Sequence, residues 1–115
     1  MKPVKFILRL EGLALATVTA LLYAHLGFSW PLFATLWLAP DLSMLGYLAG
    51  SRFGAIAYNT VHTTLGPAFL SVLALLVPSH TMLAIALLWA NHIGVDRVLG
   101  FGLKSAEGFK FTHLN

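Results

Sequence analysis

The sequence has no cysteine and very few charged residues. Without cysteine, disulfides, thiolate metal ligands and a cysteine nucleophile are all excluded. Charged residues make up only 10% of the 115 positions, whereas a soluble domain usually carries about a quarter. Such a chain lacks the polar surface that a water-soluble globule needs, so we expect lipid to surround it.

Long apolar runs fill most of the chain. Hydrophobic residues make up 58% of it, and the mean hydropathy is +0.83. The runs are too long and unbroken for the alternating strands of a membrane barrel. One membrane helix needs about 20 residues. We therefore predict a single all-α domain over residues 1–115, an integral-membrane four-helix bundle. The expected helices lie at about 6–26, 30–48, 54–77 and 81–103. A short polar C-terminal tail follows at 104–115.

The first apolar run begins like a secretory signal peptide, because the basic segment Met1–Lys5 precedes it. Glu11 interrupts the run, and no small-x-small cleavage pattern precedes His25. We therefore expect the run to be retained as the first helix.

The basic residues predict the orientation of the chain. The net charge of +3 is small and forms no clustered basic face, so we expect no nucleic-acid partner. Four spans put both termini on one side, and none of the basic residues falls in the turns 27–30 or 78–80. All seven fall on or near the side of the termini: Lys2, Lys5, Arg9, Arg52, Arg97, Lys104 and Lys110. The positive-inside rule then makes this side cytoplasmic.

Polar residues interrupt all four apolar runs. His92 and Asp96 are spaced i, i+4 and share one helix face, and Asn59 and His62, spaced i, i+3, do the same. At a rise of 1.5 Å per residue, these pairs, together with Glu11 and Asp41, lie about 8–16 Å from the cytoplasmic ends of their helices. We therefore predict one polar layer to which all four helices contribute.

The energy of burying charge decides how to interpret this layer. A charged residue near the centre of a membrane helix costs about 2.5–3.5 kcal/mol on insertion scales. Arg97 is the only nearby cation for three carboxylates, those of Glu11, Asp41 and Asp96. Either the carboxylates take up protons, or a divalent metal ion supplies the missing charge. Histidine with carboxylate oxygens is the ligand set expected for zinc, iron or manganese.

Each of these residues also has a purely structural interpretation. His62 alone can be an interhelical hydrogen bonder, Asp96 and Arg97 can be a helix-end pair, and Glu11 can cap its helix. Asp41 is hardest to explain in this way, because it follows Pro40 in an otherwise apolar run.

Several segments resemble a known family. They are Pro40–Tyr47, Tyr58–His62, His92–Arg97, Gly100–Lys104, Gly108–Phe109 and Thr112–Leu114. Together they are similar to a family of small bacterial membrane proteins catalogued as domain of unknown function 4260. The resemblance covers nearly the whole chain and implies a compact four-helix protein of the bacterial inner membrane without an assigned role. It also takes in Lys104, Phe109 and His113, which favours a tail folded back onto the site.

Our leading hypothesis is a metal-dependent membrane enzyme, a hydrolase that acts on an amphiphilic or lipid substrate from the cytoplasmic leaflet. The predicted metal ligands are Asp41, His62, His92 and Asp96. Glu11 would be a fifth ligand or the general base, Asn59 would support the site, and Arg97 and Lys104 would hold an anionic head group.

Two other classes of function stay open. The same residues can handle protons or a small polar solute in a binding or transport module, which would need a homo-oligomer because 115 residues hardly form two gates. Alternatively, the polar layer fixes the register of the helices in a structural protein.

Overall fold

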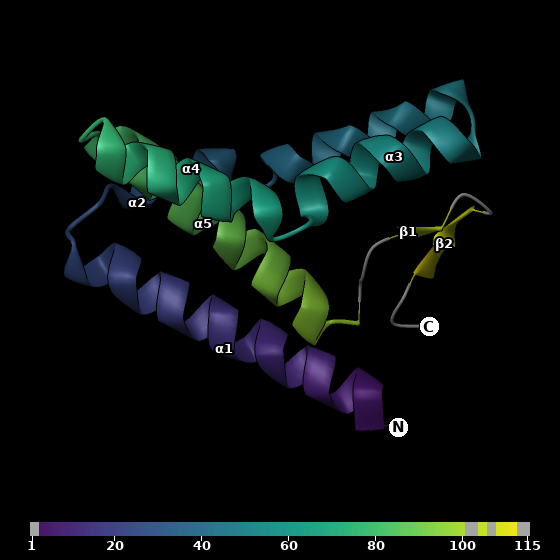
Figure 1. The fold of residues 1–115 in the computed structure, drawn as a ribbon, viewed down its shortest axis with the longest axis horizontal. Coiled ribbons are helices and arrows are strands. Elements are labelled where there is room, and N and C mark those ends of the chain that lie inside the picture. Colours follow the sequence, from purple (N-terminus) through teal and green to yellow (C-terminus); the bar gives the residue numbers. More distant parts are fainter. Residues whose placement is uncertain (1–2, 101–103, 106–107, 113–115) are drawn as a thin grey trace.

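The computed structural model describes residues 3–100, 104–105 and 108–112, and the last two segments are described by their backbone only. Figure 1 shows the arrangement. The elements are α1 (Pro3–His25), α2 (Trp30–Leu36), the 3-10 helix η1 (Ala39–Ala49), α3 (Ser51–His62), α4 (Leu65–Leu76), α5 (His80–Val98), β1 (Lys104–Ser105) and β2 (Gly108–Thr112). As predicted, the described chain is helical up to Val98.

Both middle helices, predicted over 30–48 and 54–77, are broken. Pro40 predicts a kink near Leu36, and the structure has a full break there, whereas no break was predicted in the second of these helices. The first breaks between α2 and η1, where Pro40 has no N–H to donate to the carbonyl of Leu36. The second breaks at Thr63–Thr64, between α3 and α4. Pro67, in the first turn of α4, likewise has no N–H for the carbonyl of Thr63. Two proline residues thus place two helix ends inside the protein.

Three segments of the described chain are long and apolar enough to cross a membrane, namely Pro3–His25, Trp30–Ala49 and Ser51–Leu76. They indicate a membrane protein. The fourth predicted span, now α5, is not among them. Its last turns carry Asn91, His92, Asp96 and Arg97, which lower its hydropathy.

α5 is instead the packing centre of the molecule. It runs antiparallel to α1, since Arg9 near the start of α1 donates from Nε to the carbonyl of Val98 over 2.8 Å. The two backbones touch: a Cβ added to Gly94 would lie 2.7 Å from the amide nitrogen of Ala16 and 2.8 Å from the carbonyl oxygen of Gly12. Small residues of this kind let membrane helices approach closely.

An apolar core lies toward the other end of α1 and α5. It is formed by Tyr23, Ala84, Leu87 and Leu88, with partly buried side chains from the α1–α2 connection and α2 packed against it. The hydroxyl of Tyr23 donates to the carbonyl of Ser29, which ties α1 to the start of α2.

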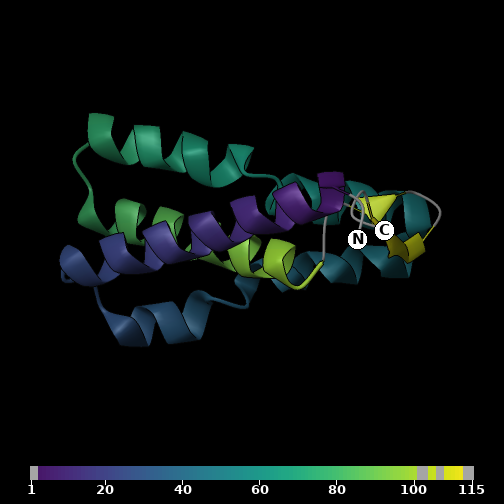
Figure 2. The same ribbon diagram turned by 90° about the horizontal axis from the view of Figure 1, so that it is seen from below.

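The chain runs back and forth along the long axis in both views (Figures 1 and 2). The start of α1, the end of α5 and the turn between η1 and α3 lie toward one end of this axis. The connections from α1 to α2 and from α4 to α5 lie at the other end.

The tail prediction needs one refinement. Part of the predicted polar tail forms a short antiparallel hairpin, in which Lys104 pairs with Thr112 and Ser105 with Gly108. The hairpin lies beside α3. His113 lies outside the described residues.

The backbone contact of α1 and α5 predicts that Gly94→Ala destabilises the fold. The added methyl group meets backbone atoms that cannot rotate away, and overpacking of this kind costs about 1–3 kcal/mol. The midpoint of thermal unfolding in detergent should fall. Ala14→Leu on the exposed face of α1 is the control and should leave it unchanged. Equal midpoints for Gly94→Ala and the native chain would contradict the close packing.

Candidate functional site

Three elements bring four ionisable side chains together. Asp41 lies in the first turn of η1, His62 ends α3, and His92 and Asp96 lie one turn apart on α5. Each offers one nitrogen or oxygen atom, and these atoms all lie within 4.8 Å of one another. We call these four residues the His/Asp cluster.

Each imidazole of the cluster faces both carboxylates. Nε2 of His62 lies 3.3 Å from Oδ1 of Asp41 and 3.5 Å from Oδ2 of Asp96. Nε2 of His92 lies 3.2 Å from each of the same two oxygens. The two histidines therefore point their Nε2 atoms at one common point between the carboxylates.

The backbone decides which nitrogen of His62 carries the hydrogen. Nδ1 lies 2.9 Å from the carbonyl oxygen of Tyr58, and only an N–H can donate there. Neutral His62 therefore turns the lone pair of Nε2 toward the carboxylates. The ring is also stacked on that of Tyr58, with centroids 3.7 Å apart and planes 5° from parallel. An outer N–H···O=C bond of this type is typical of metal-ligating histidines.

His92 is held by packing rather than by such a bond. It is fully buried, and its ring lies against that of Trp37 with centroids 4.5 Å apart. Among the described residues, none forms a hydrogen bond with its Nδ1 atom. Burial leaves the ring little freedom, so the orientation of Nε2 toward both carboxylates is fixed.

Burial is uneven across the cluster. The side chains of His62 and His92 are 3% and 0% exposed, whereas those of Asp96 and Asp41 are 15% and 38% exposed. The imidazoles therefore form the closed side of the cluster, and a ligand would reach it from the side of Asp41.

The end of α3 is held by side chains of α5. In a membrane the last carbonyl groups of a helix need partners, because no water is there to serve them. The indole N–H of Trp89 donates to the carbonyl of Val61 over 2.7 Å, and Nη2 of Arg97 donates to that of His62 over 3.3 Å. These two bonds fix His62 relative to His92 and Asp96.

A second polar network supports the break after α2. The indole N–H of Trp37 donates to Oδ1 of Asn91 over 3.0 Å. Nδ2 of Asn91 donates in turn to the carbonyl of Ala16 and to the hydroxyl of Thr19, over 2.8 and 3.2 Å. Asn91 thus connects α1 and α5 to the residue that covers His92.

The other residues predicted for the site lie outside the cluster. Glu11 lies on the exposed face of α1, although it interacts electrostatically with Arg97. Asn59 is half-buried on α3. Lys104 belongs to β1, whose side chains are not described. Arg97 donates to the carbonyl of His62 at the end of α3 and also interacts electrostatically with Asp96 of the cluster.

Trp37 and Asn91 belong to the site but were not among the residues predicted for it. Asn91 is buried and directly precedes His92, so its amide in the same apolar run was a usable signal. The position of Trp37 over His92 had no such signal, because it depends on how the chain turns after α2.

The family whose model matches is described as a domain of unknown function (DUF4260), and the match covers residues 5–115. It confirms the resemblance found from the motifs. No curated protein and no solved structure matches the chain.

The bond from Trp89 to α3 predicts that Trp89→Phe lowers the stability. The carbonyl of Val61 would lose its donor inside the protein, which costs about 1–3 kcal/mol. The midpoint of thermal unfolding in detergent is the measurement. Trp30→Phe is the matched control, because Trp30 is 49% exposed. A similar small shift for both variants would show that the indole N–H of Trp89 does not hold α3.

Proposed function

We propose a metal-dependent function for this chain, which belongs to the DUF4260 family. In this proposal the His/Asp cluster binds one divalent ion of zinc, iron or manganese in a protein of the bacterial inner membrane. The supporting observation is the convergence of two imidazole nitrogens and two carboxylate oxygens from three elements, within 4.8 Å of one another.

The distances in the cluster support four-coordinate binding. Metal–ligand bonds to histidine nitrogen and carboxylate oxygen of about 2.0–2.2 Å place neighbouring ligands of a tetrahedron about 3.3–3.6 Å apart. The four nitrogen–oxygen distances of the cluster are 3.2, 3.2, 3.3 and 3.5 Å. The four nitrogen–oxygen spacings thus match those of ligands on a single small cation, and the two remaining pairs of donor atoms lie within 4.8 Å of each other.

Charge balance favours the same conclusion. Two ionised aspartates near two neutral imidazoles leave a charge of −2 in a membrane protein, which is costly without a partner. Arg97 donates to the end of α3 and interacts electrostatically with Asp96 and Glu11, so its single positive charge does not balance both aspartates of the cluster. One divalent ion would neutralise both carboxylates without bringing in any further residue.

We further propose that the protein is a hydrolase acting on an amphiphilic or lipid substrate. A bound divalent ion would polarise the substrate and activate a water molecule. In the reaction the water oxygen bonds to the ester carbon or phosphorus, and the leaving alcohol departs with one of the water's hydrogens. The more exposed Asp41 side would admit the head group. With both termini cytoplasmic, as the positive charges predict, this side would face the inner leaflet.

Metal analysis tests the first part of the proposal. Protein produced with added zinc, iron and manganese and purified in detergent should carry about one divalent ion per chain, as measured by elemental analysis. His92→Ala and Asp96→Asn should each lose it, because each removes one of four ligands. His80→Ala and His25→Ala are the controls, since both residues are exposed on other parts of the helices.

Two results of this experiment decide between hypotheses. A stable preparation without stoichiometric metal would contradict metal binding and leave proton handling or helix register as the role of the cluster. Glu11→Gln should keep the metal, because Glu11 lies outside the cluster. If the Glu11→Gln variant lost the metal, this result would instead support Glu11 as a fifth ligand.

The hydrolase part has its own test. Metal-loaded protein in lipid nanodiscs should hydrolyse 4-nitrophenyl decanoate or 4-nitrophenyl phosphorylcholine at least about tenfold faster than His92→Ala, since the cluster supplies the activated water. Removing the metal with a chelator should lower the hydrolysis rate of the native protein to that of His92→Ala, and added metal should restore the faster rate. Rates equal to those of His92→Ala with both substrates would contradict a hydrolase of this class.

A further inference from the structure

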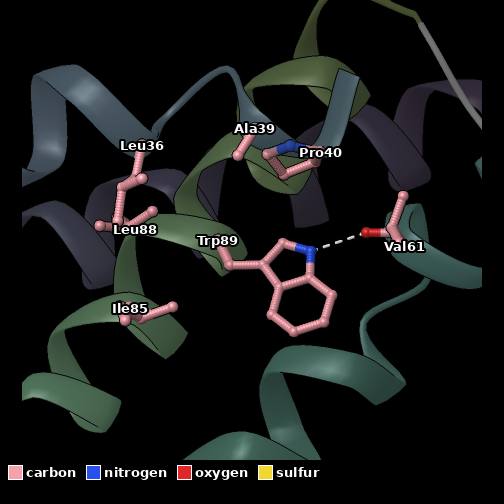
Figure 3. A pocket seen from close by; sticks show the side chains of 7 residues that line it. All are labelled: Leu36, Ala39, Pro40, Val61, Ile85, Leu88 and Trp89. Carbon is pink, nitrogen blue, oxygen red and sulfur yellow. Dashed lines mark hydrogen bonds between the residues drawn. The ribbon is translucent and has the colours of Figure 1, made fainter. Parts of the chain in front are cut away.

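Figure 3 shows an apolar pocket lined by seven residues of the segment after α2, the end of α3 and α5. It has a volume of about 350 Å³, within the range of ligand pockets. It lies between the break after α2, the end of α3 and one face of α5. Its wall includes Ala39, Pro40, Val61, Ile85 and Trp89, and none of its lining residues is charged.

The pocket and the cluster share their supporting backbone. Pro40 and Val61 line the pocket, and the next residue of each, Asp41 and His62, belongs to the cluster. Leu88 also lines the pocket and lies one turn before His92 on the same face of α5. A molecule in the pocket would therefore have one end close to the cluster.

Trp89 forms a fixed wall of this pocket. Its indole N–H is bonded to the carbonyl of Val61 over 2.7 Å, as Figure 3 shows. Gly66 of α4 leaves room for the ring, since a Cβ there would lie 2.5 Å from it. Ala39 is exposed and Ile85 only half-buried, so the pocket has an opening toward its surroundings, which are lipid for a chain of this kind.

We propose that the pocket binds one linear apolar chain of the substrate while the head group lies at the His/Asp cluster. This inference rests on the proposed metal-dependent function and adds the location and the kind of chain. The apolar wall excludes a polar or charged tail, because nothing in it would replace the lost hydration.

The pocket would act by position rather than by hydrophobic affinity. Lipid is as apolar as the pocket wall, so a chain gains little by leaving the bilayer. A chain held beside the cluster instead keeps its own head group near the metal, which raises the effective concentration there. Filling the pocket should therefore hinder long-chain ligands and leave short ones unaffected.

The test uses two ligands with the same metal-binding head group. Acetohydroxamic acid and decanohydroxamic acid are titrated into the Co²⁺-loaded full chain in nanodiscs, and binding is followed by the visible spectrum of the cobalt ion. Because this readout is at the metal, decanohydroxamic acid dissolved elsewhere in the bilayer gives no signal. Ile85→Trp and Ala39→Leu fill the pocket from two different elements, and Val72→Trp adds bulk at an exposed position of α4 as the control.

We expect both filling variants to bind Co²⁺ and acetohydroxamic acid as the native chain does. Their apparent dissociation constant for decanohydroxamic acid should rise at least about tenfold, because a chain that cannot enter the pocket no longer holds its head group beside the metal. Val72→Trp should bind both ligands normally.

The possible failures are distinguishable. If native protein and variants load Co²⁺ but bind decanohydroxamic acid equally well, the chain lies in the bilayer and the pocket proposal is overturned, while the metal proposal stands. If the native chain binds no Co²⁺ at all, both proposals are overturned.

Discussion

The contact of two carboxylates with the same two imidazoles is the constraint on which this structure depends. Asp41 and Asp96 each lie within 3.5 Å of both His62 and His92. This contact joins η1, α3 and α5, which belong to the second, third and fourth apolar runs. Such groups are costly to bury alone, so the three segments are held together at this point.

The broken helices follow from the same constraint. A continuous third helix would carry His62 in mid-helix, with its carbonyl bonded along the backbone. The break lets α3 end at the cluster, where Trp89 and Arg97 take over the carbonyls of Val61 and His62. Irregular backbone is tolerated within a membrane where protein side chains satisfy it. The break also leaves space beside α5, and this space is the apolar pocket.

The pocket and the cluster together suggest how a chain of 115 residues can contain a site. The polar groups lie at the ends of α3 and η1, and the apolar wall is formed by the residues just before them. One backbone arrangement thus supplies both a polar and an apolar surface, as an amphiphilic ligand requires. Trp37, positioned by Asn91, closes the site on the side of His92.

Composition and spacing alone determined the membrane character, the helical class and the pairing of His92 with Asp96, because these depend on local chemistry and the period of a helix. They also predicted Asp41 and His62 at the same level as this pair, and the four side chains do come together. Level along a helix does not determine which side of the helix faces its neighbours. Glu11 was predicted at a similar level but lies on the exposed face of α1, since Gly12 is the residue that packs against α5. Pro40 and Pro67 favour the two helix breaks by local chemistry. The position of Trp37 over His92 and the pocket were decided only by tertiary packing, because each depends on contacts between segments distant in the chain.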